Sequence, residues 1–355
     1  MTLALRAAPP LPRDSRVASR TSLQGRLTTL PRLATLRRLA PAAVLAVTAL
    51  LVSPRAALAC PCRGTFGPGA AVTQVVERWA LSLNPAASVV HGTWSPYGDY
   101  VPFAETTAQR SVDLALAAGF RPVRSLELGL TAAYGWQSLE LSSGSYAAHN
   151  LGDTTAHLRW MAREELMPDL GKPFAAPTLE IIAALRLPTG TVRRSGAKSA
   201  ASGTTGAVGT TATSQGLGTW ELSLGAQADK SVSRRVDLAL LLQAGYRLPD
   251  ESIGLARRLG PRALAQLTVR YRLSTETAIG LSNDLGWEGD VRYEGETEPG
   301  TGQRVWGAAA FVTFAPIASS WRSGLVLRHT PTVDLLGVNA LATTTLALSV
   351  GYGGT

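Results

Sequence analysis

Residue types that commonly perform catalysis or hold metal ions are few in this chain. Its four histidines are His91, His149, His157 and His329. They show no H-E-x-x-H pair and no other spacing that places ligands around one metal ion. No G-x-S-x-G segment marks a nucleophilic serine, and the Gly/Thr-rich stretches lack the lysine of a phosphate-binding loop. We therefore expect no enzymatic activity, no metal and no cofactor.

Charged side chains form the more informative pattern, because they recur in otherwise apolar segments and share one side of them. In a hydrated interior such charges can set ion selectivity, or they can pair with one another and fill the space. Asp153 and His157 belong to the same side. The other thirteen candidates for lining an interior are Asp113, Glu127, Arg159, Glu180, Arg186, Glu221, Asp229, Asp237, Arg247, Arg270, Arg272, Asp284 and Arg328.

The segments that carry these charges alternate between apolar and polar residues. In 112–120 the even positions hold Val, Leu, Leu, Ala and Phe, whereas the odd positions hold Asp, Ala, Ala and Gly. Residues 236–248 repeat the pattern with seven apolar even positions. A period of two is that of a β-strand with two unlike faces. We count about twelve such segments, beginning near residues 75, 109, 124, 152, 177, 217, 234, 262, 275, 303, 321 and 341.

The lengths of the connections also alternate. Links after even-numbered segments are mostly short, at 121–124, 231–234, 273–275 and 316–320. Links after odd-numbered segments are longer, at 95–107, 139–151, 189–216, 249–261, 289–302 and 331–340, and 189–216 is of low complexity. The link 164–175 is the exception, since it should be short. Short turns at one end and long loops at the other are typical of outer-membrane barrels with an even strand number.

Aromatic residues such as Trp136, Trp220, Tyr246 and Trp287 lie mostly near segment ends, as expected for rings at a membrane–water boundary. A soluble β-sandwich also alternates, but it does not require loops sorted by length. An arginine facing lipid costs about 2–4 kcal/mol at the membrane midplane, so the charged side must face inward. We therefore predict an all-β, antiparallel, up-and-down transmembrane β-barrel of about twelve strands over residues 74–355.

The N-terminal region differs from the rest of the chain. A long basic segment precedes an apolar run at 39–52, and Ala57-Leu58-Ala59 follows. This order predicts a secretory signal peptide over 1–59, since the run is shorter than the ~20 residues of a membrane helix; a single-pass anchor is the rival interpretation. The segment carries nine arginines and one aspartate, so the remainder has a formal charge of only +1. The basic pI therefore does not indicate nucleic-acid binding.

The two cysteines, Cys60 and Cys62, lie directly after the predicted cleavage site. Cys60 is a candidate for lipidation, although Ala57 is a poor match to the leucine usual at that position. The pair could also form a tight disulfide, or the segment 60–73 could be a simple periplasmic tail. Two thiols are too few for a metal site, and the remainder of the chain has no cysteine framework.

One order of motifs resembles a known group of barrels. LGDTTAHLRWMA at 151–162 precedes a strand ending in LRLPTG, and LGTWELSLGAQADKS at 217–231 precedes a strand ending in GYRLP at 245–249. This order resembles the transporter-like outer-membrane barrels first noted in phenol-degradation operons, over roughly residues 109–290. The resemblance implies passage of small, often apolar molecules. The C-terminal Tyr352-Gly353-Gly354-Thr355 departs from the terminal aromatic residue of many barrels.

These observations predict a monomeric outer-membrane protein that contacts lipid and passes a small solute. The mixed charges would set weak selectivity along a hydrated path. In a narrow barrel they could instead pair across the interior without conduction, since diameter grows with strand number. A structural or adhesive barrel that acts through its long loops is the alternative.

Overall fold

The computed structural model describes residues 77–104, 107–141, 144–164, 177–190, 218–252, 255–316 and 319–354. The predicted signal peptide, the tail 60–73 and Cys60 lie outside these residues. Within the described ranges, no helix is long and apolar enough to span a membrane.

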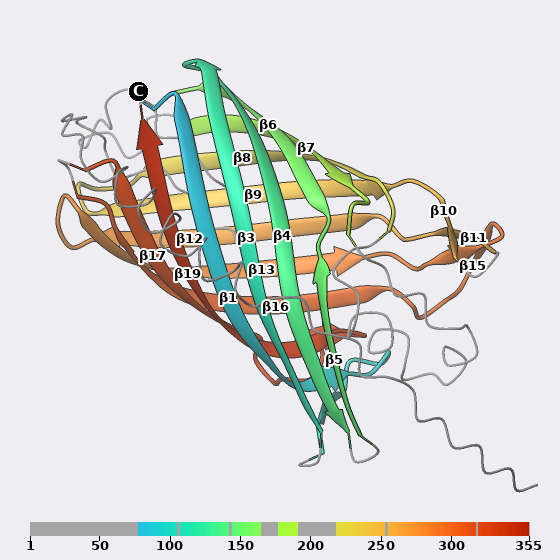
Figure 1. Ribbon diagram of the computed structural model, residues 1–355. Helices are drawn as coiled ribbons and strands as arrows, with labels where there is room; N and C mark the ends of the chain where they lie inside the picture. The colour runs from blue at the N-terminus through green and yellow to red at the C-terminus, as the bar shows by residue number, and fades with distance from the viewer. Residues whose placement is uncertain are drawn as a thin grey trace, which may run out of the picture. The chain divides into compact units, whose positions relative to one another are not determined.

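Twelve long strands close into an antiparallel barrel in the part of the chain that the structure describes (Figure 1). Each strand pairs with the next long strand along the chain, and β19 pairs with β1 to close the ring. The predicted all-β, up-and-down barrel is therefore confirmed. The long strands are β1 (Trp79–Trp94), β3 (Ala108–Val123), β4 (Leu126–Leu141), β6 (Thr154–Arg163), β7 (Thr178–Leu187), β8 (Glu221–Ser231), β9 (Val236–Arg247), β12 (Arg262–Arg272), β13 (Thr277–Glu288), β16 (Gln303–Phe314), β17 (Trp321–His329) and β19 (Leu341–Gly354).

The connections at the two ends of the barrel differ in length, as the sequence predicts. Links 124–125, 232–235 and 273–276 are tight turns at one end of the barrel, which we call the turn side. The link between β6 and β7 is longer, as expected, and most of it lies outside the described residues. The long links are at the opposite end, the loop side. Turns of outer-membrane barrels face the periplasm and long loops face outward.

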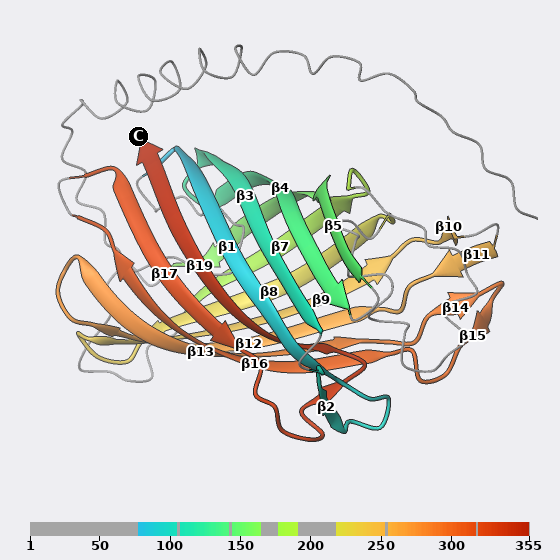
Figure 2. The same ribbon diagram turned by 60° about the horizontal axis from the view of Figure 1, so that its bottom comes forward.

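Seven short strands lie in or beside the loop-side links within the described ranges. β2 (Tyr100–Pro102) pairs with β1, β18 (Gly337–Val338) pairs with β16, and β5 (Gly144–Leu151) extends the β4 hairpin. The remaining four form a separate small sheet in the order β10-β11-β14-β15, which extends beyond the ends of β9 and β13 (Figure 2). We call it the loop sheet; its strands are β10 (Asp250–Ser252), β11 (Leu255–Arg258), β14 (Arg292–Tyr293) and β15 (Glu296–Thr297).

Two loop-side links are held together by specific contacts. The backbone N–H of Tyr100 donates to Oδ1 of Asp334 at 2.8 Å, which joins the β1–β3 link to the β17–β19 link. The Trp94 side chain is almost fully buried against Ala342, and its Nε1 donates to the carbonyl of Val333 at 3.1 Å. Buried indole groups of this kind usually have a hydrogen-bond partner. Trp94 therefore anchors the β17–β19 link to the end of β1.

Relative to a soluble protein, the distribution of apolar and charged residues is reversed: apolar residues lie on the outer face of the barrel and charged residues on the inner face. Large apolar residues such as Leu116, with 57% exposure, lie on the outer face. Charged residues alternate with them and are buried, and Glu127 retains only 1% exposure. Because the ring is closed, the outer apolar band has no second sheet to pack against, which excludes the sandwich interpretation. Such a band faces lipid, and a barrel leaves no backbone edge unpaired in it. The protein is an outer-membrane β-barrel.

Candidate functional site: the charged interior

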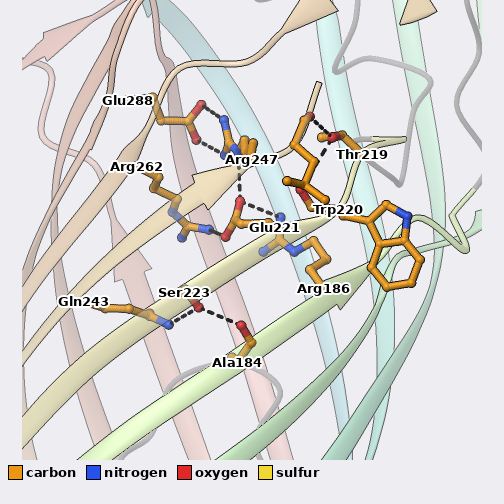
Figure 3. Close-up of polar contacts among 11 residues, drawn as sticks. Ala184, Arg186, Thr219, Trp220, Glu221, Ser223, Gln243, Arg247, Arg262 and Glu288 are labelled. Atoms are coloured by element: carbon orange, nitrogen blue, oxygen red, sulfur yellow. Dashed lines mark hydrogen bonds and ion pairs between the residues drawn. The ribbon is translucent and has the colours of Figure 1, made fainter. Parts of the chain in front are cut away.

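A cluster of five charged side chains occupies the loop-side interior (Figure 3). Arg247 Nε donates to Oε2 of Glu221 at 2.8 Å, and its two terminal nitrogens donate to the Glu288 carboxylate at 2.8 and 2.9 Å. Arg186 Nη1 and Arg262 Nη1 lie 3.9 and 3.7 Å from the Glu221 carboxylate. These residues lie at or next to the ends of β7, β9 and β13 or begin β8 and β12, so the register brings them to one level. We call them the loop-side cluster.

The arginines of the loop-side cluster are not equivalent. Arg247 is enclosed, with 2% of its side chain exposed, and forms a bidentate pair of the strong kind. Arg186 and Arg262 retain 28% and 33% exposure and reach Glu221 only at the longer distances. Three arginines face two glutamates, so the cluster has a formal charge of +1. The excess positive charge is carried by two partly exposed guanidinium groups that share the Glu221 carboxylate.

A second group of charges lies toward the turn side. Arg121 Nη2 donates to Glu127 Oε2 at 3.0 Å, and His157 Nε2 lies 3.7 Å from the other oxygen of Glu127. On the next strand pair, Arg159 Nη1 donates to Glu180 Oε2 at 3.2 Å. All five side chains are at least nine-tenths buried. Charges at this depth persist only when they are paired and hydrogen-bonded.

The same band continues across β8, β9 and β12. Asp237 accepts from Arg270 Nε at 3.1 Å and from Arg272 Nε at 2.9 Å. Asp229 accepts from Gln227 Nε2 at 2.7 Å. We call the whole band the turn-side belt; its members are Arg121, Glu127, His157, Arg159, Glu180, Gln227, Asp229, Asp237, Arg270 and Arg272. Its four arginines match its four carboxylates, so its formal charge is zero with histidine neutral.

Some ion pairs skip a strand and pass over a glycine. Arg328 on β17 donates to both oxygens of Asp284 on β13, at 3.1 and 2.6 Å, and Gly307 of β16 lies between them. A Cβ at Gly307 would lie 2.4 Å from Nη2 of Arg328. The Arg328–Asp284 pair therefore requires a residue without a side chain at this position of β16, because real Cβ atoms do not come so close to a neighbouring side chain.

The inner faces of β19, β1 and β3 form a different wall. They carry small residues, including Ser82, Ser88, Ala117, Thr345 and Ala347. The hydroxyls of Ser88 and Thr345 lie 2.8 Å apart and pair across the two strands. We call this the small-residue wall. The two sides of the interior therefore differ in charge, because the loop-side cluster and the turn-side belt lie mainly on β4 to β13.

The structure places the predicted interior residues as follows. Eleven of the thirteen join ion pairs within 4 Å: Glu127, Arg159, Glu180, Arg186, Glu221, Asp237, Arg247, Arg270, Arg272, Asp284 and Arg328. Asp229 bonds to Gln227, and Asp113 accepts from Ser111 Oγ at 3.3 Å. Asp153 accepts from the backbone N–H of Gly190 at 3.0 Å.

Sequence reasoning missed several interior charges, namely Glu77, Arg121, Arg262, Glu288 and Arg322. All lie within two residues of a strand end. Arg262 lies an even number of residues from Arg270, and Glu288 an even number from Asp284, so each shares the inner face with that residue. Following each alternation to the end of its strand would have found them. Groups of three or more potential metal ligands are absent among the described residues.

No family model matches this chain, and no curated protein matches its sequence. Solved structures do match. An outer-membrane channel of Pseudomonas putida F1, the COG4313 channel, has a TM-score of 0.62 at 16% identity, covering 82% of this chain and 99% of the channel. The translocator domain of the autotransporter NalP from Neisseria meningitidis has a TM-score of 0.44 at 12% identity, covering 90% and 96%. A toluene transporter, TbuX of Ralstonia pickettii, has a TM-score of 0.37 at 8% identity, covering 79% and 90%. The similarity to the first of these establishes the fold, that of an outer-membrane β-barrel.

Proposed function

We propose that this protein is an outer-membrane channel that lets small solutes pass through its interior. One observation carries the proposal: the inner face concentrates hydrogen-bonded charges at two levels of a closed barrel. Ordered charges at two heights can select solutes by charge and size. The thirteen predicted interior residues would line this path together with Arg121, Arg262 and Glu288.

The turn-side belt would be the narrowest part of the path. Five of its side chains, those of Arg121, Glu127, His157, Arg159 and Glu180, are at least nine-tenths buried, whereas Arg186 and Arg262 of the loop-side cluster are partly exposed. A solute would therefore enter a wider loop-side vestibule and meet the constriction afterwards. The small-residue wall gives the least steric resistance beside the belt.

Single-channel recording in planar bilayers tests this proposal directly. We expect small conductance steps for the natural protein and larger steps for the double variant Arg159→Met/Glu180→Leu, which shortens both side chains without leaving one charge unpaired. Heat-modifiable gel mobility confirms that each sample is folded. Absence of conductance in both proteins, together with absence of solute uptake into liposomes, would refute the channel.

A structural or adhesive barrel is the second candidate, and the ordered loop sheet favours it, because loop-side links with their own sheet present a fixed outward surface. Deletion of 191–214 separates the two functions. An adhesin that uses this loop should lose surface binding, whereas a channel should keep or gain conductance.

The leader and the solute complete the proposal. Residues 1–59 would direct export and be removed, which leaves a mature chain that begins at Cys60, and mass spectrometry of the mature N-terminus would detect any lipid there.

The resemblance to the barrels of phenol-degradation operons supports small, often apolar solutes. We propose a monomer, which light scattering in detergent can test.

A further inference from the structure

The outer rim of the loop side carries a basic side chain stacked on an aromatic ring. The guanidinium carbon of Arg258 on β11 lies 4.5 Å from the centroid of the Tyr246 ring. Tyr246 lies on the outer face of β9, where 46% of it is exposed, and it pairs with Leu222 on the adjacent strand. The contact is a cation–π interaction on the lipid side of the barrel wall, not in the interior.

A second arginine lies directly opposite the first in the loop sheet. Arg258 and Arg292 are register partners between β11 and β14. Directly opposed residues share a face, with Cβ atoms about 5 Å apart, so Arg292 lies on the side that faces Tyr246. Thr297 is the next register partner in that row and adds a hydroxyl.

Among the residues that the structure describes, no carboxylate balances these two like charges. Among the described residues, neither Arg258 nor Arg292 has a carboxylate within 4 Å, whereas the neighbouring Arg257 pairs with Asp250. The nearby Glu294 carboxylate instead accepts from the backbone N–H of Ala256 at 2.6 Å. Like charges opposed on a sheet are destabilising unless an anion lies between them.

The position of the pair restricts the anion. The aromatic rings of the outer face mark the boundary of the membrane, and on the loop side that boundary belongs to the outer leaflet, whose lipid headgroups carry phosphate. Paired guanidinium groups match phosphate geometry by bidentate hydrogen bonds. Along the same rim, Arg304 is exposed on the outer face opposite Trp287 and supplies a further positive charge.

We propose that Arg258 and Arg292 bind a phosphate of lipopolysaccharide against the Tyr246 ring at the outer rim of the barrel. The lipid would hold the loop sheet down on the membrane surface. This site is independent of solute passage, because its residues lie outside the barrel wall.

The turn side offers a matched control. Arg235 Nη1 donates to the Tyr271 hydroxyl at 3.1 Å in an exposed turn. It combines an arginine with an outer-face tyrosine, as the proposed site does, but at the membrane boundary that faces the periplasm.

The test measures binding of purified lipid A to the detergent-solubilised protein by native mass spectrometry. Bisphosphorylated lipid A is compared with dephosphorylated lipid A, with phosphatidylglycerol and with inorganic phosphate as competitor. We expect Arg258→Gln/Arg292→Gln to bind bisphosphorylated lipid A about tenfold more weakly, and Arg235→Gln to bind it as the natural protein does.

Three outcomes would overturn the proposal: equal binding by the double variant, equal binding of dephosphorylated lipid A, or full competition by millimolar inorganic phosphate. Because the double variant removes an unfavourable opposition, it should fold. Unchanged conductance and unchanged heat-modifiable mobility would show this, and they also separate the lipid site from the channel.

Discussion

Arg328 reaches Asp284 across an intervening strand, and the absence of a side chain at Gly307 leaves room for the contact. The pair joins β17 to β13 through a bidentate interaction on the inner face. Long-range pairs of this kind depend on three strands at once, so a change on the middle strand should disturb the two outer ones.

Gly307→Ala should therefore displace the Arg328 guanidinium and destabilise the barrel by about 1–3 kcal/mol, because the mostly buried Asp284 carboxylate loses its partner. Gly286→Ala is the control, since its Cβ would meet a Val305 methyl at 3.4 Å and the Val305 carbonyl oxygen at 3.9 Å, both ordinary contacts. Urea unfolding in detergent, followed by tryptophan fluorescence, measures both. Equal stability of the two variants would contradict this account of the pair.

Two arginine–glutamate pairs of similar length should differ greatly in their contribution. Arg159–Glu180 is enclosed in the turn-side belt at 3.2 Å, whereas Arg124–Glu164 spans 3.0 Å at the rim with 62% of the arginine exposed. Arg159→Ala should cost about 3–5 kcal/mol, since a buried carboxylate is left alone. Arg124→Ala should cost at most about 1 kcal/mol. The same unfolding assay tests this ranking, and a reversed order would refute it.

The loop-side cluster should favour anions. Arg186→Gln and Arg262→Gln each remove a partly exposed positive charge, so the reversal potential in a salt gradient should shift toward cation preference, most in the double variant. Arg110→Gln, on the outer face of β3, removes the same charge outside the interior and should leave the reversal potential unchanged. An equal shift in Arg110→Gln would show that general surface charge sets the selectivity.

Trp94 should control the order of the loop side. Trp94→Ala removes the packing against Ala342 and the hydrogen bond to Val333, with an expected cost of about 3–5 kcal/mol. Limited proteolysis should then cut the β17–β19 link in the folded barrel. Tyr97→Ala serves as control because Tyr97 is almost fully exposed in the same loop region; cleavage at equal rates would argue against the anchor.

The sequence allowed much of the barrel to be predicted because each long strand has unlike faces over many residues. In β9, six alternating apolar positions fix the strand and show which side Asp237 and Arg247 occupy. The partners within the interior could not be derived in the same way. Arg247 bonds to Glu288 two strands away, and that contact depends on the register of β9, β12 and β13 together.

The loop sheet also could not be predicted from the sequence. Its strands are two to four residues long, too short to show a period. The opposition of Arg258 and Arg292 arises only because two separate links pair with each other. Residues at strand ends, such as Arg121 and Arg322, were missed for a related reason, since few neighbours remain there to define an alternation.

The pairing of β19 with β1 has a consequence for biogenesis. Because the first and last long strands meet, the ring has two unsatisfied edges until the final residues of the chain are delivered. The ion pair of Arg322 with Glu77, at 3.0 Å, forms across that same seam. The barrel can therefore close only when β1 and β19 are both present, and a chain shortened by either strand would leave an open, aggregation-prone sheet.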